Sequence, residues 1–190
     1  MNIWFTSDSH YAHRNISGKK ESTWKSGYRD FNSTQEMNNA LVKNINDMVK
    51  EGDTLYHLGD WSFGRKDNIK TFRDSIICKN IHLVLGNHDE HIEESPEEYL
   101  DCFSSINQVY KGYIGRNYFY LSHYSNQVWP KSHRGSIHLF GHSHNSISPI
   151  GKSMDVGVDA HPEFRPFHIN EILMKLDKKD LETVDHHGRK

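Results

Sequence analysis

The stretch IHLVLGNHD, residues 81–89, joins an apolar run of strand length to a glycine turn and a polar cluster. A short apolar run bounded by a turn predicts a buried β-strand. The side chains of Asn87, His88 and Asp89 follow it directly, so we expect them at the carboxyl end of that strand. In α/β architectures this is the edge at which ligands bind. The stretch therefore predicts an α/β fold with a polar site at a sheet edge.

The same combination, a strand followed by a polar motif, occurs at five places along the chain. The motifs are Asp8-Ser9-His10, Gly59-Asp60, Gly86-Asn87-His88-Asp89, His123 and Gly141-His142-Ser143-His144. Carboxylate, amide oxygen and imidazole suit Mn²⁺, Fe²⁺ or Zn²⁺, whereas an all-oxygen set would suit Mg²⁺ or Ca²⁺. Each motif alone is a weak signal, because Asp and Gly-Asn also form turns and caps. Together they can fill two adjacent metal sites, the arrangement that clamps both oxygens in phosphoester cleavage.

Composition limits the function classes. The 190 residues carry a formal charge of −2, which disfavours nucleic acid as the main partner. The length suits one domain, expected over residues 1–176, with a charged tail over residues 177–190. Cys78 and Cys102 fit no disulfide framework or zinc spacing and are expected to be small buried side chains. No leader or membrane span is recognisable, so a cytoplasmic protein without a membrane partner is expected, its oligomeric state left open.

Strand and helix patterns alternate along the chain, which predicts an α/β domain. A capping box at Ser33 and Glu36 begins an amphipathic helix. The segment 13–31 lacks periodicity and is expected to be a loop or lid. Strands are expected over residues 2–7, 54–58, 81–85, 108–113, 117–122, 136–140 and 154–158, helices over 34–50 and 67–77, a helix start at Pro96, and a short strand or helix over 167–176.

The motifs resemble those of the calcineurin-like metallophosphoesterases: D-x-H, then G-D, G-N-H-[DE], H and G-H-x-H. Every element is present, and the resemblance spans residues 2–159. The stretch Asp155-Val156-Gly157-Val158-Asp159 also looks like that of short bacterial and phage members. The resemblance implies a four-layer α-β-β-α sandwich with two mixed β-sheets and a dimetal site at its edge.

The resemblance also implies roles for the motif residues and a pair of divalent cations, with Mn²⁺ favoured and Fe²⁺ or Zn²⁺ open. The family reaction is in-line attack on phosphorus by metal-activated water, and here His88 would protonate the leaving group. By this analogy Asp8, His10 and His144 would bind the first metal, Asn87, His123 and His142 the second, and Asp60 both.

Residues beside the motifs are less informative. His13 and Arg14 are candidates for substrate contact, and Trp24 or Tyr28 could stack on a base, although a solvated loop is an equally good interpretation. Asp89 could orient His88 or cap the following helix, and the cap is the favoured interpretation. Basic residues in or beside the 13–31 loop that could attract an anion are Arg14, Lys19, Lys20, Lys25 and Arg29. Of the other histidines, His57 and His82 are expected to be packed within strands, and His161, His186 and His187 to be exposed.

These observations predict a dimetal phosphodiesterase acting on a small or nucleotide-like phosphodiester. Alternatives are a phosphomonoesterase and a catalytically silent metal-binding scaffold, and the charge balance disfavours a nuclease. Arg65 follows Asp60 too late to match the arginine-bearing element of protein serine/threonine phosphatases, and Asp89 stands where that group has Glu. A small phosphoester is therefore the expected substrate.

Overall fold

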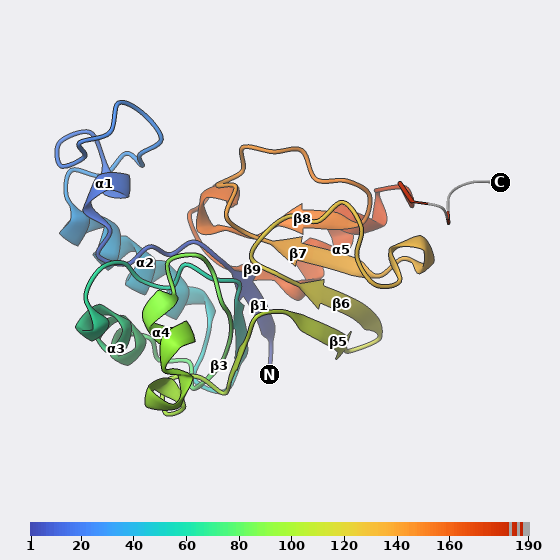
Figure 1. The fold of residues 1–190 in the computed structure, drawn as a ribbon, viewed down its shortest axis with the longest axis horizontal. Coiled ribbons are helices and arrows are strands. Elements are labelled where there is room, and N and C mark those ends of the chain that lie inside the picture. The colour runs from blue at the N-terminus through green and yellow to red at the C-terminus, as the bar shows by residue number, and fades with distance from the viewer. Residues whose placement is uncertain (183, 186, 188–190) are drawn as a thin grey trace.

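The computed structural model describes residues 1–182, 184–185 and 187, and its core is a pair of packed β-sheets (Figure 1). The first sheet has the order β4-β3-β2-β1-β9. Strands β1 to β4 are parallel, and β9 joins β1 in the antiparallel sense. The strands are β1 (Ile3–Thr6), β2 (Thr54–His57), β3 (Asn80–Val84), β4 (Ser105–Asn107) and β9 (Phe167–His168).

The second sheet has the order β5-β6-β7-β8 and is also mixed. Strands β5 and β6 form an antiparallel hairpin, whereas β6, β7 and β8 run parallel. The two sheets therefore each contain parallel strands whose carboxyl ends carry the polar motifs. The strands are β5 (Tyr110–Ile114), β6 (Asn117–Leu121), β7 (Ile137–Phe140) and β8 (Ser153–Asp155).

Alternation along the strands creates two separate apolar layers. On β1, Trp4 packs among the helices, whereas Phe5 packs between the sheets, where its ring stacks on Tyr56 and Phe119. Successive side chains of a strand point to opposite faces, so one strand supplies both layers. The helices over the first sheet are α1 (Arg14–Ser17), α2 (Thr34–Met48), α3 (Lys66–Ser75) and α4 (Glu90–Glu94), with the 3₁₀-helix η1 (Pro96–Tyr99).

The longest helix shows why these residues cover the sheet. The Ser33 hydroxyl accepts a hydrogen bond from the Glu36 amide and caps the start of α2, as the capping box predicts. Met37, Leu41 and Ile45 follow at helical spacing and are buried against the strands. The amphipathic pattern therefore fixes both the start of α2 and the face that it buries.

A segment that includes Asn126 and Trp129 covers the outer face of the second sheet. The His138 ring lies on this face, 5.2 Å from the buried Trp129 ring, and the Asn126 amide donates to His138 Nε2. The covering segment includes the 3₁₀-helix η2 (Ser132–Arg134). Helix α5 (Ile169–Asp177) contacts β1 and β8 and buries Ile172 and Leu176. The mixed α/β sandwich that the motifs imply is therefore confirmed.

Several expectations outside the motifs need correction. His161 is buried against the Phe167 ring, because the 3₁₀-helix η3 (Val158–Ala160) turns it inward, whereas exposure was expected. The segment 13–31 contains the short helix α1, and the expected helix at Pro96 is a single 3₁₀ turn. Strand β4 was not anticipated, and the helix expected after Asp89, α4, had been given no bounds. Cys78 and Cys102 are buried and free, as expected, and His186 lies outside the described residues.

The packing expected of His57 and His82 and the exposure expected of His187 are confirmed. His57 and His82 are packed within strands, where their rings contact the Ser9 and Ser105 hydroxyls, and His187 is exposed. Among the residues that the structure describes, no helix is long and apolar enough to cross a membrane.

Asp53 ties the start of β1 to the turn after α2 and provides a stability test. Its buried carboxylate accepts hydrogen bonds from the amides of Asn2 and Lys50 and from the Trp4 indole. Burial opposes the charge, but these bonds outweigh it and lower the pKa of Asp53. We expect Asp53→Asn to lower the free energy of unfolding at pH 7 by about 1–3 kcal/mol in urea titrations.

The lowered pKa of Asp53 determines how its contribution to stability changes with pH. Because the folded pKa is lower than the unfolded value, the stabilisation is present above the unfolded pKa of about 3.9 and is lost as pH falls through the folded pKa. The difference between wild type and Asp53→Asn should therefore shrink below about pH 4. The exposed Asp101→Asn is the matched control and should leave stability unchanged. A difference that is constant with pH would contradict the charged role of Asp53.

Candidate metal centre

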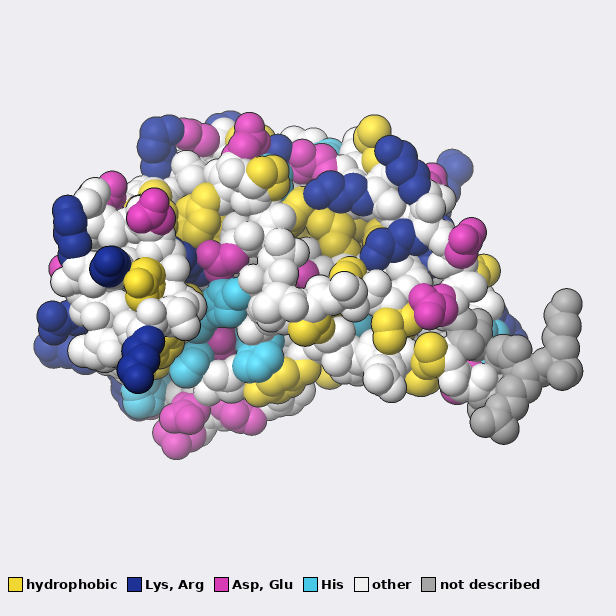
Figure 2. Space-filling view, turned by 90° about the horizontal axis from the view of Figure 1, so that it is seen from above, with side chains coloured by type: hydrophobic (Ala, Val, Ile, Leu, Met, Phe, Trp, Pro, Cys, Tyr) yellow, Lys and Arg dark blue, Asp and Glu magenta, His cyan; other side chains and the backbone are white. Residues whose placement is uncertain are grey.

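The five motifs meet at one edge of the sandwich. They follow β1, β2 and β3 of the first sheet and β6 and β7 of the second. Backbone hydrogen bonds join the loops, because the Asp8 amide donates to the Gly59 carbonyl and the Gly141 amide to the His123 carbonyl. Seen from above, several histidine side chains gather on this face, to the left of its middle (Figure 2). The five polar motifs therefore form a single cluster at the edge of the sandwich.

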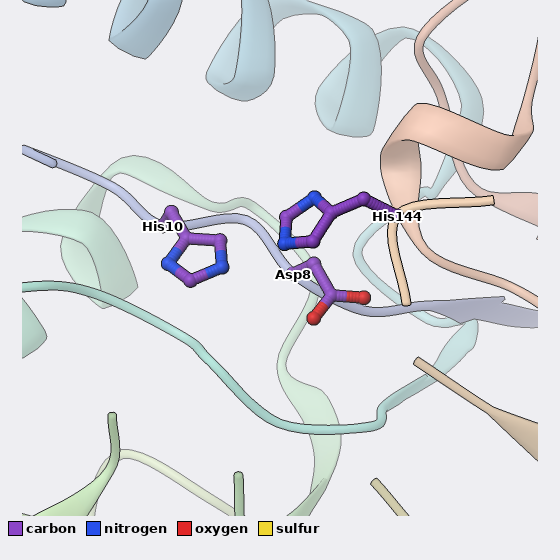
Figure 3. Close-up of side chains that lie close together, drawn as sticks. All are labelled: Asp8, His10 and His144. Atoms are coloured by element: carbon purple, nitrogen blue, oxygen red, sulfur yellow. The ribbon is translucent and has the colours of Figure 1, made fainter. Parts of the chain in front are cut away.

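The described residues form three overlapping groups of donor atoms, and one of them, His10, Asp60 and His88, links the other two. In each group the ligating atoms lie within 4.8 Å of one another. Asp60 Oδ2 lies 3.3 Å from His10 Nε2 and 3.5 Å from His123 Nε2. Asp60 thus stands between the groups, where one carboxylate can face two cations. The first group, shown in Figure 3, is Asp8, His10 and His144, and the second is Asp60, His123 and His142.

The donor set fits a divalent cation. His10 is buried, and its Nε2 atom has no hydrogen-bond partner. A buried polar atom without a partner costs roughly 1–3 kcal/mol, so native proteins rarely leave one without a reason. The atom faces the Asp60 carboxylate among imidazoles and carboxylates, the ligands that Mn²⁺, Fe²⁺ and Zn²⁺ accept.

Backbone strain occurs at five of the candidate metal ligands. Their φ angles are positive, in a region that non-glycine residues enter at a cost of order 1–3 kcal/mol each. Such strain persists only where the surrounding structure enforces it, and it clusters at functional sites. The φ angles are 57° at Asp8, 49° at His10, 56° at Asp60, 64° at His142 and 46° at His144.

Two motif glycines are explained by close approach. A Cβ atom at Gly86 would lie 2.3 Å from Asp60 Oδ1, and one at Gly141 would lie 2.0 Å from the Ser7 hydroxyl and 2.6 Å from Asp8 Oδ2. Neither position can carry a side chain without moving a carboxylate of the site. The glycines therefore allow the loops to close around Asp8 and Asp60.

Electrostatics in the cluster reflect burial and proximity. Burial raises the pKa of Asp8 to about 7, against the opposing effect of His144 and His123. Burial likewise disfavours charge on Asp60 and His123, but their mutual attraction outweighs it, lowering the pKa of Asp60 and raising that of His123 to about 9. Cations at this site would stabilise both carboxylates, and ligation would require His123 to lose its proton.

Asn87 and His88 occupy the outer side of the cluster. Asn87 Oδ1 lies 3.1 Å from His123 Nε2 and accepts a hydrogen bond of 3.4 Å from the Tyr124 hydroxyl. The His88 amide donates to Asp60 Oδ1, while the exposed His88 ring lies 5.3 Å from the His10 ring. A ring nitrogen of His88 also falls within the donor range of His10 and Asp60. The structure thus brings together every residue expected to bind metal, with His88 at the exposed rim.

Asp89 does not cap α4, which corrects the expectation. Its carboxylate accepts hydrogen bonds from the amides of Asp60, Trp61 and Gly86, at 2.8, 3.0 and 2.8 Å. Its side chain makes no bond to the start of α4. The buried carboxylate instead fastens the β3 loop to the β2 loop. Asp89 therefore fixes where Asp60 stands.

Two aspartates that the sequence analysis gave no role hold the histidine loop after β7. Asp155 accepts hydrogen bonds from the Ser143 hydroxyl and the Asn145 amide. Asp159 Oδ2 lies 2.6 Å from His144 Nδ1, which leaves His144 Nε2 to face Asp8. Arg29 contacts both Asp159 oxygens at 2.8 Å and donates to the carbonyl oxygens of Asp8 and Ser9. The buried Arg29 is therefore a structural link rather than a free cation for substrate.

A carboxylate on the far nitrogen of a ligating histidine orients the ring and raises its basicity, which predicts the effect of changing Asp159. We expect Asp159→Asn to weaken one of two Mn²⁺ equivalents by about 10–100-fold, measured by titration of metal-stripped protein, and the other much less. The nearby exposed Glu163→Gln is the control. Equal affinity of both equivalents for Asp159→Asn and wild type would contradict this role, while thermal unfolding reports the loss of the Arg29 pair separately.

A cavity of about 720 Å³ opens over the cluster. Of the two candidates for substrate contact, His13 lines it with its ring stacked 3.7 Å from Phe63, whereas Arg14 is exposed at the start of α1 and is not part of the lining. Within the described part of the chain, the lining contains no Lys or Arg. The cavity wall includes Ile16, Trp24, Tyr124, Ser125, Ser146 and Ile147.

Comparisons with known proteins bear on the family and the fold. A family model described as the calcineurin-like phosphoesterase superfamily domain matches residues 1–156. An uncharacterized protein from Methanocaldococcus jannaschii is 30% identical over 193 residues, covering 96% of each chain. A solved protein of unknown function from Aquifex aeolicus aligns with a TM-score of 0.66 at 20% identity, covering 92% of this chain and 98% of that one. A solved archaeal phosphodiesterase aligns with a TM-score of 0.50 at 19% identity, covering 83% and 82%.

Proposed function

This chain belongs to the calcineurin-like phosphoesterase superfamily, and from that premise we propose that it is a dimetal phosphodiesterase that hydrolyses a small, nucleotide-like phosphodiester. The observation that carries the proposal is the position of Asp60 between two donor groups. Its Oδ2 atom lies 3.3 Å from His10 Nε2, a buried atom without a hydrogen-bond partner, and 3.5 Å from His123 Nε2. A shared carboxylate between two imidazole-rich groups is the arrangement that a two-metal site needs.

In this proposal Asp8, His10 and His144 hold the first cation and Asn87, His123 and His142 the second, with Asp60 contacting both. The cations, Mn²⁺ by preference, would supply charge neutralisation on the phosphate and activation of water. The protein residues fix the ligand geometry through the strained loop backbone and through Asp89, Asp155 and Asp159.

In this proposal His88 is the general acid that protonates the leaving-group oxygen. Its ring is exposed at the cavity, and its amide is held by Asp60 Oδ1 at 2.9 Å, so its position is coupled to the metal ligands. A positioned imidazole is a suitable general acid near neutral pH. The neighbouring His13 ring is stacked on Phe63, which keeps it beside the same part of the cavity.

The cavity favours a diester over a monoester. Trp24 borders the cluster through the His13 ring at 5.4 Å, and Tyr124 borders it through the His142 ring at 4.6 Å. The two aromatic side chains thus border different histidines of the cluster, and a substituent of a bound phosphate can lie against each of them. The described lining offers no Lys or Arg to take the second charge of a monoester dianion.

The test compares hydrolysis of bis-p-nitrophenyl phosphate and p-nitrophenyl phosphate by metal-stripped protein refilled with Mn²⁺. Metal-dependent cleavage with higher kcat/KM for the diester is the expected result. A preference for the monoester would replace the diesterase by a phosphomonoesterase. Two bound metals without turnover of either ester would instead support the silent metal-binding scaffold and reject the proposal.

A further inference from the structure

Trp24 is an exposed aromatic side chain held beside the metal cluster. Its exposed fraction is 45%, whereas Trp4, Trp61 and Trp129 are at most 7% exposed. It lines the cavity and meets the His13 ring edge-on, with centroids 5.4 Å apart. A large indole that is exposed to water beside a cavity provides an apolar surface on which a ligand can bind.

The loop that carries Trp24 is fastened on both sides. The Asn15 amide oxygen accepts hydrogen bonds from the Thr23 amide and hydroxyl, and the Trp24 amide donates to the Ser22 hydroxyl. Beyond the indole, the buried Arg29 anchors the chain to Asp159. Hydrogen bonds therefore hold the loop that presents the indole to the cavity. Little conformational entropy of this loop needs to be lost when a ligand binds.

Other parts of the cavity wall are also apolar and uncharged. Tyr124 and Ile147 line the cavity with exposed fractions of 51% and 44%. Lys19, Lys20 and Lys25 belong to the same loop as Trp24 but do not line the cavity, so the described wall offers no cationic contact for a further phosphate. Such a wall suits a flat, uncharged ring rather than a polyphosphate chain or an acidic group.

We propose that Trp24 is a stacking platform for an aromatic ring, a nucleobase or an aryl group, carried by one ester arm of a singly charged phosphodiester. The proposal rests on the proposed function, because a phosphate held by the cluster places its substituents against the walls of the cavity. Stacking of a base on an aromatic side chain is sequence-tolerant and worth about 1–3 kcal/mol. Trp24 therefore selects for a ring rather than for a particular base.

Kinetics with three diesters test the platform. The ring-bearing substrates are bis-p-nitrophenyl phosphate (aryl) and the p-nitrophenyl ester of thymidine 5′-monophosphate (nucleobase), and glycerophosphoethanolamine, followed by ³¹P NMR, has no ring. Trp24→Ala should raise KM for the ring-bearing diesters by roughly 5- to 150-fold with little change in kcat, and leave glycerophosphoethanolamine unaffected. Trp24→Phe should restore most of the loss. The larger effect of the two ring-bearing arms identifies which ring the platform prefers.

Tyr28→Ala is the matched control, because Tyr28 is an aromatic residue of the same loop that does not line the cavity. It should leave KM unchanged for all three diesters. Equal effects of Trp24→Ala on diesters with and without rings, or no effect on any, would overturn the platform.

Fluorescence separates this proposal from the proposed function. Since Trp24 is the exposed tryptophan, the methyl ester of thymidine 5′-monophosphate, a singly charged diester, should quench its emission in wild type, glycerophosphoethanolamine should not, and Trp24→Phe should remove the quenching. Quenching without hydrolysis of any ester would overturn the proposed function and support the platform. Hydrolysis without quenching would overturn the platform and leave the phosphodiesterase standing.

Discussion

Asp60→Ala should abolish phosphodiester hydrolysis and lower metal occupancy at both sites. The Asp60 carboxylate lies within 3.5 Å of imidazoles from both donor groups, so its loss removes a ligand from each. We expect activity to fall by more than ~10³-fold, beyond the ~10²–10³-fold that one electrostatic contact is worth. Bound Mn²⁺ should fall from about two to below one per chain in metal analysis after gel filtration.

Two variants keep this prediction independent of folding. Asp60→Asn retains an oxygen that can accept the His88 amide but carries no charge, so it should fold and still lose both activity and occupancy. Asp67→Ala removes an exposed carboxylate and should change neither. Full occupancy of both sites in Asp60→Asn would show that this carboxylate does not bridge two cations.

His88→Ala should keep both cations and lose rate. The His88 ring is exposed at the rim of the cluster, whereas Asp8, His10, Asp60 and His123 are buried. Loss of a general acid costs about 10²–10⁴-fold in kcat. The loss should be largest for an alkyl leaving group, which needs a proton, and smallest for p-nitrophenolate, which departs without one.

His91→Ala serves as the control, because His91 is a partly exposed histidine on the adjacent helix α4. It should leave metal content and turnover unchanged. Loss of a metal equivalent in His88→Ala would make His88 a ligand with His10 and Asp60 instead of an acid. Unchanged turnover of a substrate with a poor leaving group would also reject the assignment.

Strong local patterns allowed most of the fold to be predicted from sequence. Strands β1, β2, β3 and β7 are dense apolar runs that end at polar motifs, and helix α2 has both a cap and a periodic apolar face. Strand β4 could not be predicted from the sequence, because Ser105–Asn107 is short, polar and only half-buried. The bounds of helix α4 could not be predicted, because five residues, Glu90–Glu94, give too few positions to show a period.

The candidate ligands could be anticipated because each follows its own strand, and the carboxyl ends of neighbouring parallel strands meet at one edge. The residues that position them could not. Arg29 and Asp159 are 130 positions apart, and no local spacing relates them. Asp89 looked like a cap because Asp at the start of a helix usually is one, but the close approach at Gly86 brings the β2 loop within its reach.

The measurement that tests the two-metal account most directly is a Mn²⁺ titration of metal-stripped protein with bis-p-nitrophenyl phosphate turnover followed at each step. The account predicts that turnover requires the second equivalent, reaches its plateau at about two Mn²⁺ per chain and disappears on chelation. Full turnover at one equivalent, or turnover that survives chelation, would contradict it.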